Sequence, residues 1–101
     1  MRLPGYDRAV LGPAKLRDYC LDPNHLRGKH KARVFRAALG LTAADWEQLR
    51  DAILAAIEVE DAHRSESDQY GQRYFVDFEM TTTMGRARIR TTWIVLRLEQ
   101  P

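Results

Sequence analysis

The sequence is poor in the residues that build cross-linked, membrane-spanning or metal-binding proteins. Its one cysteine, Cys20, cannot form a disulfide within the chain. No apolar run approaches the roughly 18 residues of a membrane span, and there is neither a Cys/His cluster with zinc spacing nor a Gly-rich phosphate loop. We therefore expect no membrane contact, no metal and no other cofactor. The N-terminus also lacks the apolar core of a signal peptide, which predicts a cytoplasmic protein.

The charges that are present are spread unevenly along the chain. The 101 residues fit a single domain and carry a net charge of +2. Residues 1–40 have a net charge of +6, residues 41–70 of −6 and residues 71–101 of +2. If the two basic parts meet in space, they make a surface that attracts anions. If they do not, the asymmetry reflects solvated faces, and the sequence leaves both interpretations open.

Three amphipathic helices are predicted, over residues 13–21, 29–39 and 42–59. A proline suits the start of the first, Gly40 suits the left-handed position after the second, and Thr42 with Asp45 resembles a capping box at the third. The single cysteine is expected to pack as a small hydrophobe. The predicted apolar faces are Leu16, Tyr19 and Cys20 on the first helix, Val34, Ala37, Ala38 and Leu39 on the second, and Trp46, Leu49, Ile53 and Ile57 on the third.

After residue 70 the hydrophobic period changes from that of a helix to that of a strand. Large apolar residues alternate with polar ones from Tyr74 to Met80, and a second alternating segment follows Gly85. We expect an antiparallel hairpin over residues 70–98, with a loop longer than the tight two-residue kind. Residues 61–69 are polar and predict a loop. Because two strands make a poor sheet, a third is expected from the N-terminal lead-in, from the tail or from another copy of the chain.

This order of elements predicts an α+β fold in one domain, residues 1–101. Three N-terminal helices, within residues 13–60, pack on a small antiparallel sheet built from the C-terminal hairpin, residues 70–98. A sheet of this size has an open edge, which a partner protein or a second copy of the chain would cover as a homodimer.

A basic cluster stands at the start of the second predicted helix, and it comprises Arg27, Lys29, His30, Lys31 and Arg33. A helix N-terminus attracts anions through its free N–H groups and its dipole. Cations are unfavourable for the helix at this end, and such a local conflict hints at function. Histidine is the side-chain type whose reference pKa lies near neutrality, so His30 is the candidate acid or base. The alternative is a solubilising basic loop in which His30 caps or packs.

A second basic group lies on the last predicted strand, where Arg86, Arg88 and Arg90 share one face. They suit a phosphate-binding surface. The sequence favours the alternative, in which they form cross-strand ion pairs with Asp77 and Glu79.

Tyr70 stands at the entrance of the first predicted strand, next to Gly71. An aromatic side chain in that place can stack on a base. The alternative is an aromatic residue that pins the loop.

Three blocks of sequence resemble a small bacterial domain family of unknown function. The blocks are LRDYCLDPNHLRGKHKARVFRAALGLT, YGQRYFVDFEM and RIRTTWIV, and the likeness covers roughly residues 3–95. In that family the strand ending in WIV is followed by one more strand, where this chain reads LRLEQP. The resemblance therefore implies that the family's last strand is missing or replaced here.

More distantly, the layout resembles the barnase–EndoU–colicin–RelE group of small ribonucleases. That resemblance implies a metal-independent, toxin-like domain that cleaves RNA and is neutralised by a small cognate antitoxin-like protein. A base would take the proton of a ribose 2′-hydroxyl, and cations would stabilise the charge that develops on the phosphate. The implied roles are catalysis for His30 and Lys31, phosphate binding for Arg27, Lys29, Arg33, Arg88 and Arg90, and base stacking or orientation for Tyr70 and Thr91.

The competing prediction is a non-catalytic module. The same basic surface would bind nucleic acid without cleaving it, or the open sheet edge would dock a partner protein. The sequence leaves open whether the protein is an enzyme.

Overall fold

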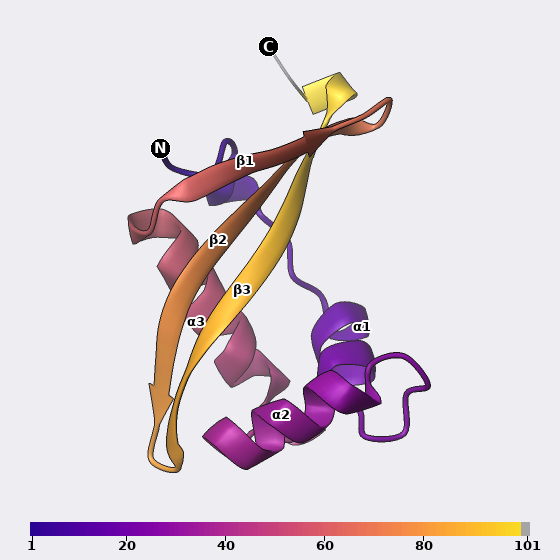
Figure 1. Ribbon diagram of the computed structural model, residues 1–101, viewed down its shortest axis with the longest axis vertical. Coiled ribbons are helices and arrows are strands. Elements are labelled where there is room, and N and C mark those ends of the chain that lie inside the picture. The colour runs from indigo at the N-terminus through magenta and orange to yellow at the C-terminus, as the bar shows by residue number, and fades with distance from the viewer. Residues whose placement is uncertain (100–101) are drawn as a thin grey trace.

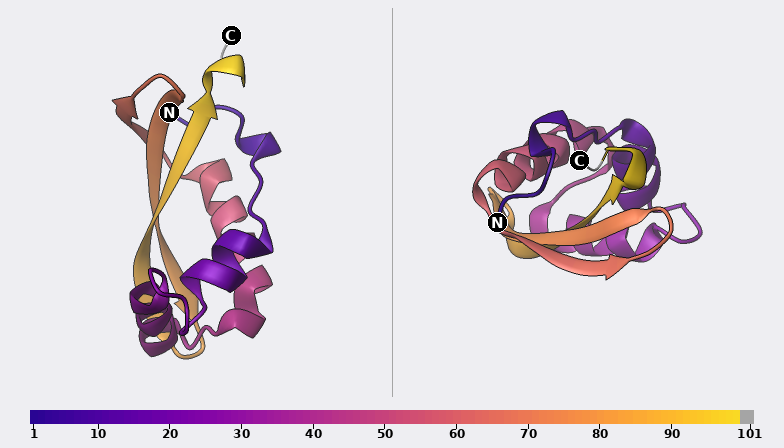
Figure 2. Two further views of the ribbon diagram at one scale, coloured as in Figure 1. Left: turned by 90° about the vertical axis from the view of Figure 1, so that its right-hand side faces the viewer. Right: turned by 90° about the horizontal axis from the view of Figure 1, so that it is seen from above.

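The computed structural model describes residues 1–99, which form helices on one face of a three-stranded antiparallel sheet (Figures 1 and 2). The strands lie in the order β1-β2-β3, with β2 in the centre. The elements are η1 (Tyr6–Arg8), α1 (Pro13–Lys15), the π-helical turn η2 (Leu16–Cys20), α2 (Lys29–Leu39), η3 (Ala43–Asp45), α3 (Trp46–Val59), β1 (Ala62–Ser67), β2 (Gly71–Thr82), β3 (Gly85–Leu96) and η4 (Arg97–Glu99).

The predicted α+β class is confirmed, but its details need two corrections. The sheet is more than a C-terminal hairpin, because the segment predicted as a polar loop contains β1, which pairs with β2. The helical elements are not all N-terminal, since the 3₁₀ turn η4 follows β3. The N-terminal lead-in supplies no strand, although the Ala62 N–H donates a backbone bond of 2.6 Å to the Met1 carbonyl at the outer edge of β1.

The hairpin of β2 and β3 lies within the predicted residues 70–98 but has a tighter turn than predicted. Thr82 pairs with Gly85, so only two residues form the loop. The predicted alternation is confirmed on β2, where Tyr74, Val76 and Phe78 are buried against the helices. The two strands run the length of the molecule, with the hairpin turn beside α2 and both described ends of the chain at the opposite end (Figure 1).

Helix α3 forms the floor of the core, as its periodicity predicts. Leu49 and Ile53 are buried beneath the sheet. The capping box is also confirmed, because the Thr42 N–H and hydroxyl both donate to Asp45 Oδ2, at 2.8 and 3.1 Å. With the bond from the Asp45 N–H to the Thr42 carbonyl at 2.9 Å, these bonds fix how the chain enters η3 and, through it, α3.

The predicted apolar face of α2 is wrong in part. Val34 has 63% of its surface exposed, whereas Ala32 and Leu39 are buried and Phe35 is half-buried. The buried face therefore starts at Gly28, where a Cβ atom would lie 2.0 Å from the Tyr19 carbonyl oxygen. Only glycine permits this approach, and it packs the start of α2 directly against η2.

Gly40 ends α2 in the left-handed conformation that the sequence predicts, with φ of 69°. Two contacts then fix the C-terminal end of α2 to the hairpin turn. The Thr82 hydroxyl donates to the Leu39 carbonyl at 2.8 Å, and Met84 lies against Gly40. As a result α2 is held at both of its ends, by η2 and by the turn.

Candidate functional site: a groove beside the edge of β3

A groove of about 720 Å³ runs between β3 and the helical elements α1, η2 and α2. Strand β3 is an edge strand, because it pairs with β2 alone among residues 1–99. Helix α3 closes the bottom of the groove with Leu49 and Ile53, and Phe35 and Val34 line the wall formed by α2. The floor is therefore apolar, and the exposure of Val34 is explained by its place on this wall.

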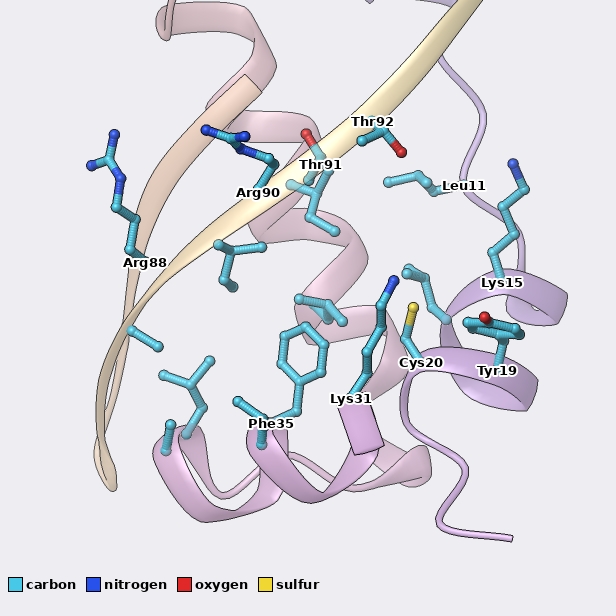
Figure 3. A pocket seen from close by; sticks show the side chains of 18 of the residues that line it. Leu11, Lys15, Tyr19, Cys20, Lys31, Phe35, Arg88, Arg90, Thr91 and Thr92 are labelled. Atoms are coloured by element: carbon cyan, nitrogen blue, oxygen red, sulfur yellow. The ribbon is translucent and has the colours of Figure 1, made fainter. Parts of the chain in front are cut away.

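The rim of the groove is basic. Lys15 and Lys31 stand on the helical side, and Figure 3 shows the Lys31 ammonium reaching toward the open space beside Cys20. Lys31 also lies over the Tyr19 ring, with its Nζ 5.7 Å from the ring centroid. Arg88 and Arg90 complete the rim on the β3 side, and no carboxylate is among the residues that line the groove.

The structure brings together part of the predicted site. His30 and Lys31 line the same groove as Arg88 and Arg90, which lie nearly sixty residues further along the chain. The two basic segments of the sequence therefore meet at one concavity. Their charged ends differ in direction, because the guanidinium groups of Arg88 and Arg90 turn to the far side of β3, away from Lys31 (Figure 3).

On that far side the two arginines bind Asp77. Arg90 donates to both carboxylate oxygens of Asp77, at 2.8 and 2.9 Å, and Arg88 lies 3.8 Å away. The bonds from Arg90 hold the pKa of the Asp77 carboxyl below its usual range. The cross-strand ion pair that the sequence favoured for this ladder is thus present, and Arg88 is the more weakly engaged of the two.

The remaining predicted phosphate-binding residues, Arg27, Lys29 and Arg33, are exposed and lie outside the groove. Tyr70 is also exposed, and it lies just before β2, at the end of the hairpin farthest from α2 (Figure 1). These residues do not share one site with His30.

Thr91 lines the groove but its hydroxyl has a structural function. Its Oγ1 donates to the Val76 carbonyl at 3.0 Å and accepts the indole N–H of Trp93 at 2.8 Å. Both partners are part of the sheet, so this hydroxyl fixes Trp93 against β2. Trp93 packs against two groups of buried residues, one around Leu49 and one around Val76, and its orientation shapes the groove wall.

Cys20 faces the groove as a half-buried thiol. Burial raises the pKa of this thiol, and the charges of Lys31 and Lys15 offset only part of that effect. A raised pKa keeps the thiol protonated, which agrees with the prediction of a packing rather than a nucleophilic cysteine.

Two features of the structure are not predicted by any pattern in the sequence. The first is His25, whose Nδ1 accepts the backbone N–H groups of Arg27 and Gly28 at 3.1 and 3.0 Å. It orders the loop that leads into α2, and a histidine in this position has no established capping signature. The second is a stack on the uncovered face of the sheet, where His63 lies 5.0 Å from the Phe75 ring and Arg90 lies over the same ring at 4.1 Å.

Among residues 1–99, no group of His, Cys, Asp or Glu side chains has the geometry of a metal site. None of the helices in this part of the chain is long and apolar enough to cross a membrane.

Comparison with known proteins gives one positive result. Neither the curated proteins nor the solved structures contain a match to this chain. Residues 2–100 match a family described as a domain of unknown function, DUF6883. The match supports the predicted membership of an uncharacterised domain family and gives no support to the ribonuclease resemblance. Because it spans nearly the whole chain, the protein belongs to the DUF6883 family.

Proposed function

We propose that this domain is a protein-binding module whose groove takes up an extended segment of a partner, which pairs with β3 as a fourth strand. The observation that carries the proposal is the coincidence of an open strand edge with an apolar groove along the same strand. Strand addition of this kind takes its affinity from backbone hydrogen bonds and its specificity from pockets for alternate side chains.

The direction of the β3 backbone supports this proposal. In an antiparallel pair, successive residues point their N–H and C=O groups alternately toward and away from the partner strand. The Arg97 N–H donates to the Tyr70 carbonyl at 3.0 Å, so the odd-numbered residues of β3 direct their backbone N–H and C=O groups toward β2. Arg88, Arg90 and Thr92 then point their backbone groups toward the groove. No backbone bond from another element reaches these three residues within the described part of the chain.

Proline at position 92 tests the proposal. Thr92 is exposed and its N–H points outward, so Thr92→Pro removes one edge donor without breaking the β2–β3 ladder. Thr92→Val is the matched control, because it changes the side chain and keeps the N–H. The protein would be used to select binders from a displayed library of random nine-residue segments. We expect enriched segments that bind wild type and Thr92→Val but not Thr92→Pro. Failure to enrich any segment, or equal binding to Thr92→Pro, would refute the proposal.

RNA cleavage is the second candidate, and it is favoured by the shared groove of His30, Lys31, Arg88 and Arg90. In this mechanism His30 is the base or acid, and the cations hold phosphate. His30→Ala should abolish cleavage of RNA and leave most of the affinity, which should fall steeply as salt rises. A purified protein that leaves RNA intact and does not slow growth when expressed would eliminate this candidate.

A further inference from the structure

The residues around the groove restrict which segment can occupy it. An added strand on β3 alternates its side chains between two faces of the sheet. The inward side chains would meet the apolar floor of Leu49 and Ile53 and the wall of Val34 and Phe35. The outward side chains would lie beside the arginine ladder, of which Arg88 is 73% exposed. The two sides therefore require different chemistry.

The charged side chains that line the groove are all basic. Lys15 and Lys31 have no carboxylate partner within residues 1–99. Arg86 and Arg88 lie at 4.0 and 3.8 Å from their carboxylates, at the limit of an ion pair, and both are largely exposed. Among Lys15, Lys31 and the arginine ladder, Arg90 alone is bound tightly to a carboxylate within residues 1–99. Opposite charges directly across two strands stabilise the pairing, and like charges destabilise it.

The same ladder argues against a second copy of this chain as the occupant. If β3 paired with β3 of another copy in the antiparallel direction, its even-numbered residues would face one another. Arg86, Arg88 and Arg90 of one copy would then lie beside the same residues of the other. Such a like-charge arrangement opposes the homodimer that the open edge otherwise allows.

We infer that the occupant is an acidic strand of a partner protein, with apolar side chains directed into the groove and carboxylates directed toward Arg86 and Arg88. This inference rests on the proposed strand addition and specifies its partner. Lys15 and Lys31 add to the selection from the opposite rim, because they raise the positive potential along the whole path of the strand. A segment with outward lysines would meet repulsion on both sides.

Three synthetic segments of nine residues test the inference. Each has Val at the inward positions and differs only at the outward positions, which are Glu, Thr or Lys. Each is joined to the C-terminus of the whole chain through a flexible Gly/Ser linker, which raises the effective concentration to the order of millimolar. Pairing is measured by hydrogen exchange of the Arg88, Arg90 and Thr92 amides, which strand addition would protect.

We expect the Glu segment to protect these amides at least about tenfold more than the Lys segment, with Thr in between, since several cross-strand pairs add. The difference should shrink as salt rises. Arg88→Glu should reverse the preference toward the Lys segment. Arg64→Glu is the matched control, because it makes the same change of charge on β1, at the opposite edge of the sheet, and should leave the preference intact.

The outcomes separate the two proposals. Equal protection by the three segments, or no effect of Arg88→Glu, would overturn the acidic partner while strand addition itself stands. No protection by any segment would overturn both. A concentration-dependent dimer of the untethered chain that Thr92→Pro abolishes would identify a second copy as the occupant and would refute the inference.

Discussion

Replacing Thr91 with valine removes one oxygen atom and keeps the shape of the side chain. That oxygen makes two hydrogen bonds, one to the Val76 carbonyl at 3.0 Å and one from Trp93 Nε1 at 2.8 Å. Each bond contributes about 1 kcal/mol, and the half-buried indole N–H loses its partner outright. Valine is also favoured in strands, which offsets part of the loss. We expect Thr91→Val to lower the free energy of unfolding by about 1–2 kcal/mol.

Urea denaturation measures this change. With a slope on the order of 1–2 kcal/mol per molar urea for a domain of this size, the midpoint should fall by about 1 M. Thr91→Ser is the control, because it keeps the hydroxyl and should retain both bonds. Trp93→Phe removes the other end of the second bond, so a double-mutant cycle should show a coupling of about 1 kcal/mol between positions 91 and 93.

The result that would refute this reasoning is a Thr91→Val protein as stable as wild type, or effects at positions 91 and 93 that simply add. If the hydroxyl instead orients an RNA base, Thr91→Val should fold with unchanged stability and lose RNA binding. Both outcomes are measured on the same protein, and they are told apart by whether its stability falls or stays unchanged while RNA binding is lost.

Three other perturbations give distinct results. Leu49→Ala should lower the free energy of unfolding by about 2–5 kcal/mol in urea denaturation, because Leu49 is fully buried; a loss below about 1 kcal/mol would contradict its place in the core. His25→Ala should cost about 1 kcal/mol by removing an acceptor of two backbone N–H groups, and His25→Asn, which restores an acceptor, should recover part of it. The pKa of Asp77 is lowered by its bond from Arg90, so the ion pair stabilises the fold above the unfolded pKa of about 3.9 and is lost as pH falls through the lower folded value. The stability difference between wild type and Asp77→Asn should therefore shrink below about pH 4, and a difference that is constant from pH 3 to pH 7 would show that the carboxylate is not responsible.

The helices and the long hairpin follow from local patterns in the sequence. Helix α3 has apolar residues at every third or fourth position and a capping box before it, and both signals act within a few residues. The alternation along β2 is equally local. Such elements are predictable because their own side chains define the face that becomes buried.

Strand β1 is different, since only Ala62 among its residues is buried. Its conformation is set by pairing with β2 rather than by its own hydrophobic pattern, and a polar segment of this kind reads as a loop. The apolar pattern of α2 predicts its buried face only in part, for a related reason. Gly28 approaches Tyr19 closely and Ala32 is buried, and both are small, which hydrophobicity alone does not reveal.

The candidate site depends on contacts between distant segments. The meeting of Lys31 with Arg88 at one groove requires the complete fold, although the two basic segments were visible in the sequence. The guanidinium groups of the arginines point toward Asp77 because of the register between β2 and β3. That register is set by the hairpin loop, which lacks the usual Asn-Gly signal. The sequence therefore predicts which residues lie at the groove better than it predicts the direction in which their charged groups point.

The π-helical turn Leu16–Cys20 has a consequence for how this groove could arise. The turn is closed by the bond from Leu21 N–H to the Leu16 carbonyl, which spans one residue more than an α-helical turn. Deleting one residue here would let α1 continue as a regular α-helix, and the residues before the deletion would rotate by about 100°. Lys15 would leave the rim of the groove. A single-codon deletion in this turn would thus change the charge on the rim of the groove while leaving the sheet intact.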